Sequence, residues 1–207
     1  MRLLVTSCLG PAGMSVLHLL RDVADVTCIG VDADITRASL HIPKATSPIY
    51  LDELRAVIQS ESIDFVLPCS DEEAILLATI DDPKFVTHPV ETVKVCRDKL
   101  ALYHAVDRFV SVPRTLKPAF LKPHCSRGSR GAFKLPDSYL ACEYIDGDEF
   151  SVDAVFWHGR LAFGVQRRRV CIVDGICTRG EVLWNETLAD KVLRLSRILT
   201  FHGPVNI

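Results

Sequence analysis

Short apolar runs alternate with amphipathic helical patterns through the first part of the chain. The β-prone runs fall at 2–7, 25–34, 63–68 and 84–88. The helical patterns fall at 10–23, 50–61 and 70–80. Strands that alternate with helices at this pitch predict a parallel sheet with helices on both faces, that is, a doubly wound α/β unit.

Spacing within the helical patterns predicts which side chains are buried. Leu51, Leu54 and Ile58 share one face of the second helix. Ser70 and Glu73 have the spacing of a capping box, which predicts that the third helix begins there. The face expected to be buried on the first helix consists of Val16, Leu17, Leu20 and Val23.

Beyond this unit the pattern changes. Residues 91–109 predict one polar helix that connects two parts of the chain. The rest of the chain is β-rich, and hairpin-type turns are expected at 146–147 and 158–159. A last helix is expected over 186–201, followed by the start of a strand at 203–207.

Composition narrows the class of protein. The chain has 207 residues and a formal net charge of -2, so no overall field attracts nucleic acid. No apolar run approaches the roughly 18 residues needed to span a bilayer, so no membrane partner is expected. The eight cysteines are scattered without a C-x-x-C pair, which predicts reduced thiols in a cytoplasmic protein, and the histidines lack metal-binding spacing.

A glycine-containing turn follows the first apolar run. Gly10 and Gly13 enclose Pro11, which removes an N–H, so the turn departs from the G-x-G-x-x-G pattern of dinucleotide sites. Asp32, near the end of the second run, could accept hydrogen bonds from a ribose. Two interpretations stay open: a tight strand-to-helix turn, or a site for another small ligand at the helix N-terminus.

A second glycine-containing segment lies at 124–131, shortly after Lys122. Gly128 and Gly131 allow backbone N–H groups to turn toward an anion, and Ser129 adds a hydroxyl donor. The segment is predicted to be a β-hairpin that closes over phosphates. The alternative interpretation is a solvated basic hairpin turn.

Four motifs in one order strengthen the phosphate interpretation. They are D-K at 98–99, K-P at 122–123, G-S-R-G at 128–131 and E-Y-I-D-G-D-E-F-S-V-D at 143–153. This order resembles the ATP-grasp superfamily, and within it the large chain of carbamoyl-phosphate synthase. The resemblance implies a Rossmann-like pre-ATP-grasp α/β domain over 1–97 and an α+β ATP-grasp domain over 98–207 that lacks its C-terminal strands.

The resemblance also implies a nucleotide site. ATP would lie between two β-layers, where Lys99 and Lys122 neutralise phosphate charge and Glu149 holds the ribose hydroxyls. The strand that carries Tyr144 and Ile145 would pack against adenine and read the purine edge. The full set of residues expected to bind ATP is Lys99, Lys122, Gly128, Ser129, Gly131, Glu143, Tyr144, Ile145 and Glu149.

The reaction that the resemblance implies is activation of a carboxylate through an acyl phosphate, followed by attack of an amine. Its partners would be small-molecule carboxylate and amine substrates, its cofactors ATP and Mg²⁺, and an oligomer is compatible with it. Arg169 is the candidate catalytic residue, placed to contact the acyl phosphate or the substrate carboxylate. The alternative for Arg169 is a solvated arginine.

Three departures from the family pattern affect the expected activity. The stretch before Lys122 is short, the lid over 113–150 is reduced, and the E-x-N strand that holds Mg²⁺ in relatives does not occur before Ile207. These departures predict a fragment of a longer ligase or a protein with impaired catalysis. Two other classes stay open: a non-catalytic module that binds a nucleotide or another small ligand, and an NAD-linked oxidoreductase.

Overall fold

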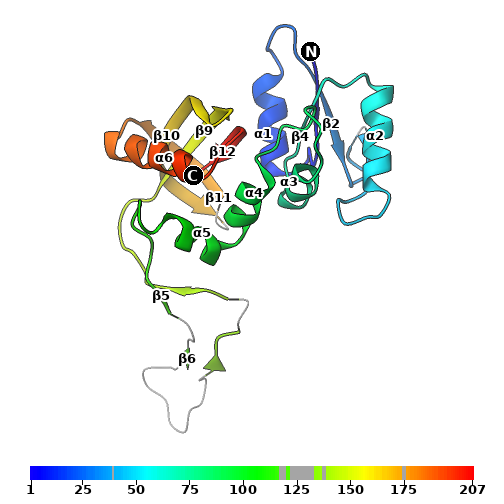
Figure 1. Cartoon of the computed structure of the whole chain (residues 1–207). Helices are drawn as coiled ribbons and strands as arrows, with labels where there is room; N and C mark the ends of the chain where they lie inside the picture. The colour runs from blue at the N-terminus through cyan, green and yellow to red at the C-terminus, as the bar shows by residue number, and fades with distance from the viewer. Residues whose placement is uncertain (39, 117–119, 122–132, 137–138, 174–175) are drawn as a thin grey trace.

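The computed structural model describes residues 1–38, 40–116, 120–121, 133–136, 139–173 and 176–207. Within them, two four-stranded sheets form the body of the molecule, and two short strand pairs extend from it (Figure 1). The chain is therefore mixed α/β, as predicted. In this described part of the chain, no helix has the length and apolar character needed to cross a membrane.

The N-terminal sheet is parallel. Its strands are β1 (Arg2–Val5), β2 (Thr27–Asp32), β3 (Leu40–His41) and β4 (Phe65–Leu67), in the order β3-β2-β1-β4. The strand expected at 84–88 is reduced to an isolated bridge between Val66 and Phe85. The sequence did not predict β3, because two residues are too few to show a hydrophobic period.

Helices cover both faces of the parallel sheet. They are α1 (Pro11–Leu20), α2 (Tyr50–Ser60) and α3 (Asp71–Ala78). Leu4 of β1 packs in the core that includes α2, whereas Leu3 and Val5 pack in the core that includes Leu17 of α1, because successive side chains of a strand point to opposite faces. Val23 lies beyond the end of α1 and is 44% exposed, so the prediction that it is buried is wrong.

The helical segment that connects the two sheets is broken. α4 (Val90–Arg97) ends at Asp98, whose side chain accepts hydrogen bonds from two backbone N–H groups of the next turn, at 2.9 and 3.1 Å. Asp98 is therefore the N-cap of a new helix, α5 (Lys99–Val106). The prediction of a single helix over 91–109 is wrong for this reason.

Two short antiparallel pairs follow α5. They are β5 (Thr115–Leu116) with β8 (Ala141–Cys142), and β6 (Phe120–Leu121) with β7 (Phe133–Lys134). In Figure 1 these pairs extend away from both sheets, on the side of α5. They fall in the region that the sequence assigned to a reduced lid.

The C-terminal sheet is antiparallel. Its strands are β9 (Phe150–Trp157), β10 (Arg160–Val173), β11 (Ile176–Leu183) and β12 (Gly203–Asn206), in the order β11-β10-β9-β12. The hairpin at 158–159 is confirmed, since His158 and Gly159 both have positive φ, 47° and 76°. The hairpin expected at 146–147 is wrong, because that turn joins β8 to β9, which do not pair.

One helix, α6 (Glu186–Ile198), covers one face of the antiparallel sheet. Val192 of α6 is 3% exposed and lies in the same core as Ala154 and Phe156 of β9. The helix expected over 186–201 is thereby confirmed. Hydrogen bonds join this part to the N-terminal part. Among them, the Thr92 hydroxyl donates to the carbonyl oxygen of Thr200 at 2.9 Å, and the His202 backbone N–H donates to the His88 ring at 3.0 Å.

Candidate functional site

The face of the antiparallel sheet opposite α6 carries a row of paired charges. The neighbours of Asp153 along β9 pack toward α6, so Asp153 points to the opposite face. The register places Arg167 and Arg169 of β10 on the same face. Arg167 pairs with Asp153 at 2.6 Å, and the Asn206 amide donates to that carboxylate at 2.6 Å. We refer to the surface formed by these four residues as the open face.

Arg169 and Glu149, both predicted to be site residues, lie together. The backbone N–H of Arg169 donates to the carbonyl oxygen of Glu149 at 2.7 Å, and the guanidinium pairs with the Glu149 carboxylate. The side chain of Arg169 is 17% exposed and that of Glu149 is 53% exposed. The pair therefore lies at the rim of the open face, with a carboxylate accessible to solvent and Arg169 largely covered.

The segment 143–149 links β8 to β9. Its first residue, Glu143, is fixed to Arg114: the carboxylate accepts from the Arg114 backbone N–H at 2.9 Å and from the guanidinium at 2.7 Å. These bonds, the backbone one first, lower the pKa of Glu143 from its usual range. Tyr144 is 90% exposed and Ile145 is 65% exposed, so the segment presents apolar surface on which an aromatic ring could stack.

Lys99 is the first residue of α5, and its side chain is exposed. Tyr103 lies one turn further on the same face of α5 and interacts with the thiol of Cys142 in β8. Burial, followed by this interaction, raises the pKa of Tyr103. The segment 143–149 begins directly after Cys142, so its start lies near the face of α5 that carries Lys99. Its other end, at Glu149, pairs with Arg169 of β10.

The remaining predicted phosphate ligands are not part of this geometry. Lys122, Gly128, Ser129 and Gly131 lie outside the described residues, so the phosphate hairpin remains a prediction. The strands β6 and β7 on either side of it are described and pair antiparallel.

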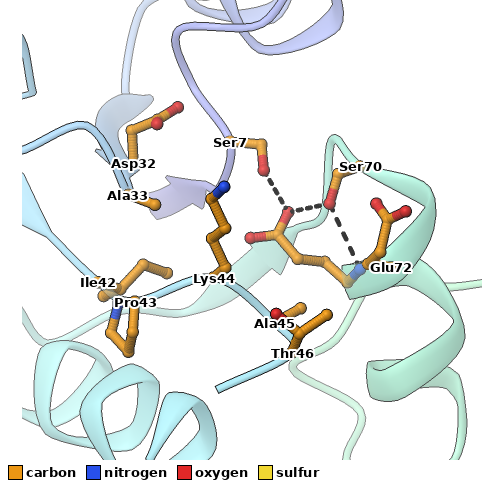
Figure 2. A pocket seen from close by; sticks show the side chains of 11 residues that line it. Ser7, Asp32, Ala33, Ile42, Pro43, Lys44, Ala45, Thr46, Ser70 and Glu72 are labelled. Carbon is orange, nitrogen blue, oxygen red and sulfur yellow. Dashed lines mark hydrogen bonds between the residues drawn. The ribbon is translucent and has the colours of Figure 1, made fainter.

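A cavity of about 530 Å³ lies at the carboxyl end of the parallel sheet (Figure 2). Residues at the ends of all four strands line it: Ser7 after β1, Asp32 at the end of β2, Ile42 after β3 and Ser70 after β4. Open α/β sheets bind ligands at this position, where the strand order reverses, here between β1 and β4. Lys44 extends into the cavity toward Ser7 (Figure 2).

Glu73 of α3 supplies a buried carboxylate to this cavity. The residue is 4% exposed, and its carboxylate accepts hydrogen bonds from four hydroxyl groups at 2.7 to 3.1 Å. They belong to Thr6, Ser7, Tyr50 and Ser70. All four are neutral, so the described residues leave the charge of Glu73 without a counter-ion. Burial and then this charge raise the pKa of Tyr50, and likewise raise that of Cys69 to about 11.

The glycine turn after β1 is explained by packing. A Cβ on Gly13 would lie 2.6 Å from the Cα of Cys8 and 2.6 Å from the carbonyl oxygen of Ser7, so no larger residue fits. The Asp32 carboxylate holds the same turn by accepting the backbone N–H of Leu9 at 3.0 Å. This geometry favours the tight strand-to-helix turn over a dinucleotide site.

Sequence reasoning missed Lys44 and Glu73 as cavity residues. It identified Glu73 only through the capping box with Ser70, which is confirmed, since the Ser70 hydroxyl accepts the Glu73 backbone N–H at 3.3 Å. The available signal was a serine after each of β1 and β4, Ser7 and Ser70, because the carboxyl ends of parallel strands meet at one edge. Lys44 had no such signal, because β3 was not predicted.

A family model matches the C-terminal part of the chain. Residues 136–207 match the model described as "ATP-grasp in the biosynthetic pathway with Ter operon". These residues include the open face and the segment 143–149. No curated protein matches the chain in sequence.

Solved structures match the chain over nearly its whole length. An L-amino acid ligase from Bacillus licheniformis is 14% identical with a TM-score of 0.58, covering 99% of this chain and 62% of its own. N5-carboxyaminoimidazole synthase from Aspergillus clavatus, in complex with ADP and 5-aminoimidazole ribonucleotide, is 13% identical with a TM-score of 0.61, covering 99% and 64%. An ATP-grasp superfamily protein from Archaeoglobus fulgidus is 17% identical with a TM-score of 0.60, covering 100% and 75%.

These likenesses define the fold as that of the ATP-grasp ligases. The family-model match, which covers residues 136–207, agrees with this fold in the C-terminal part of the chain. They do not single out carbamoyl-phosphate synthase. The chain spans 62% of the length of the amino acid ligase, and a shared fold does not by itself transfer an activity.

Proposed function

We propose that this chain binds ATP and serves ATP-dependent ligation of a carboxylate to an amine. The open face and the segment 143–149 form one wall of the nucleotide site in this proposal. The observation that carries it is the pair of Arg169 and Glu149, which lies within the residues that match the ATP-grasp family model. A carboxylate for sugar hydroxyls and a cation for phosphate lie side by side there, and a nucleotide requires both.

The chemistry of these side chains fits ATP. The Glu149 carboxylate can accept hydrogen bonds from both ribose hydroxyls, and it is accessible to solvent. Arg169 offers planar N–H donors to a phosphate or to a substrate carboxylate. The exposed side chains of Tyr144 and Ile145 offer apolar surface to adenine. When bound, ATP supplies the phosphoryl group that activates the carboxylate.

Lys99 supports a phosphate position at the start of the same segment. A lysine in the first turn of a helix meets the positive end of the helix dipole, which is unfavourable. A bound phosphate would gain an ion pair with Lys99, whereas the backbone N–H groups of Leu100 and Ala101 already donate to the Asp98 carboxylate. In the proposed site, Glu143 holds the segment through Arg114, and further phosphate contacts come from Lys122, Gly128, Ser129 and Gly131.

The described residues do not fit a magnesium site. Among them, no group of three His, Cys, Asp or Glu side chains is arranged to hold a metal ion. On the open face, Asp153 is engaged by Arg167 and Asn206. No step of the proposed reaction is therefore assigned to a metal held by these residues.

The finer assignments follow from the sequence motifs. We assign residues 1–97 to a doubly wound pre-ATP-grasp domain and 98–207 to an ATP-grasp domain whose lid, 113–150, is reduced. The order of the motifs supports a member that resembles the large chain of carbamoyl-phosphate synthase.

Titration with a non-hydrolysable ATP analogue tests the proposal. Glu149→Gln is expected to weaken binding by about tenfold or more, because it removes a charge-assisted hydrogen bond. Glu186→Gln is the matched control: it removes the same charge from the first turn of α6, on the other face of the antiparallel sheet. If both variants bind as the parent chain does, Glu149 is not a nucleotide ligand and the proposal fails.

A further inference from the structure

The cavity at the carboxyl end of the parallel sheet has the size and place of a ligand site. Its volume of about 530 Å³ is in the range of small-molecule pockets. It lies where the strand order reverses, and the nucleotide proposal uses none of its residues. Its first wall residue, Ser7, has a φ of 46°, a conformation that is uncommon for serine and that tends to occur at functional sites.

The charge of the cavity favours a cationic group. Three carboxylates line it, those of Asp32, Glu72 and Glu73, whereas Lys44 is the one cation among its described lining residues. Glu73 matters most, because it is buried and its four partners are neutral hydroxyls. An uncompensated buried charge is costly, so a ligand that brings a positive charge close to it gains affinity.

Two of the hydroxyl groups around Glu73, those of Ser7 and Ser70, line the cavity and can accept hydrogen bonds from a ligand. Ser7 donates its proton to the carboxylate at 2.9 Å, and Ser70 donates its proton at 3.0 Å. A hydroxyl group has one proton, so a serine that donates it to Glu73 can only accept a hydrogen bond from a ligand in the cavity. An ammonium group has three N–H donors and no acceptor, which is the complement of such a wall.

Lys44 selects a second group on the ligand. Its side chain reaches into the cavity toward Ser7 (Figure 2), and no described residue forms an ion pair with it. A simple anion would be repelled by the three carboxylates, and a simple amine would gain nothing from Lys44, whose side chain is exposed. A ligand that carries both a positive and a negative charge can interact with the carboxylates and with Lys44.

We infer that this cavity binds a small molecule carrying an ammonium group and an acidic group, such as an amino acid. The ammonium group lies toward Ser7, Ser70 and the charge of Glu73, and the acidic group lies toward Lys44. The binding claim stands independently of the nucleotide site. Its meaning for catalysis, a place for the amine substrate, rests on the proposed function.

The experiment titrates the full chain, without nucleotide, with each of the standard L-amino acids by calorimetry. At least one is expected to bind at a single site. Its N-acetyl derivative, which lacks the ammonium charge, and its methyl ester, which lacks the acid, are each expected to bind about tenfold or more weakly. Absence of binding by every amino acid overturns the inference, as does equal binding of the N-acetyl derivative.

Substitutions then locate the site. Glu73→Gln and Ser7→Ala are each expected to weaken amino acid binding, and the second leaves the buried carboxylate in place if the first disturbs folding. Lys44→Met is expected to remove the preference for the free acid over the methyl ester, whereas Lys191→Met on α6 is expected to keep it. Equal behaviour of the two lysine variants overturns the assignment of Lys44.

Nucleotide titration on the same samples separates the two proposals. If the parent chain binds the nucleotide but no amino acid, only the proposal that the cavity binds an amino acid is contradicted. Intact amino acid binding without nucleotide binding contradicts only the ATP site.

Discussion

Glu149 and Arg169 are joined twice, through a backbone hydrogen bond of 2.7 Å and through their side chains, although twenty positions separate them in the sequence. The two bonds fix the end of the segment 143–149 against β10. They place an accessible carboxylate beside a largely covered guanidinium at the rim of the open face. The rim is therefore a fixed feature of the fold before any ligand binds.

A double-mutant cycle measures how firmly this pair is held. The variants Glu149→Ala, Arg169→Ala and the double variant are expected to give a coupling of about 1 kcal/mol in the free energy of unfolding, measured by urea denaturation. The exposed pair of Asp190 and Arg194 on α6 is the comparison, with an expected coupling of about 0.3–0.5 kcal/mol. A coupling for Glu149 and Arg169 that does not exceed this comparison would mean that the pair is loosely held.

Gly13 is predicted to tolerate no side chain. Gly13→Ala places a Cβ 2.6 Å from backbone atoms of the β1–α1 turn, so it is expected to destabilise the protein by about 1–3 kcal/mol. Gly164→Ala is the control, because the nearest atom to its Cβ would lie 3.7 Å away. Thermal unfolding of both variants checks the prediction. Equal melting temperatures would show that the turn can relax.

Two histidines in the loops before α4 and β12 form a hydrogen bond between the N-terminal and C-terminal parts of the chain, which predicts a pH dependence of stability. The ring of His88 accepts the backbone N–H of His202 at 3.0 Å, and burial lowers the pKa of His88 despite a hydrogen bond with Pro204. Burial and then His158 also lower the pKa of His202. The histidines of the unfolded chain therefore bind protons at a higher pH than those of the folded chain. The stability that the two neutral histidines contribute is complete above about pH 6.5 and decreases as the pH falls below it.

Unfolding measured between about pH 7.5 and 5.5 tests this dependence. The free energy of unfolding is expected to fall over this range in the parent chain. His88→Gln is expected to flatten the dependence, whereas His104→Gln on α5 is expected to keep it. An unchanged slope in His88→Gln would assign the dependence to other groups.

The sequence was sufficient to predict three strands of the parallel sheet and the buried face of α2. Long apolar runs and helical spacing are local signals, and Leu54 is buried as its spacing requires, whereas Val23 is exposed because α1 ends before it. β3 is too short to carry a period, and the helix break at Asp98 depends on a side chain that can either continue a helix or cap one.

The candidate sites differ in how far the sequence could predict them. The motif at 143–153 identified Glu149, and β-rich patterning located Arg169, but their pairing depends on the register set by the turn at His158. The cavity depends on four strand ends that meet only in the folded sheet, including the end of β3. The sequence therefore revealed only the local role of Glu73, as a partner of Ser70 in the capping box of α3.

Hydrogen exchange with and without a non-hydrolysable ATP analogue tests the central claim most directly, because it locates bound nucleotide on the backbone. The nucleotide is expected to slow exchange in 143–150 and 166–170 and to leave 8–14, the turn between β1 and α1, unchanged. Protection of 8–14 without protection of 143–150 would contradict the account, because it would place the nucleotide on the parallel sheet.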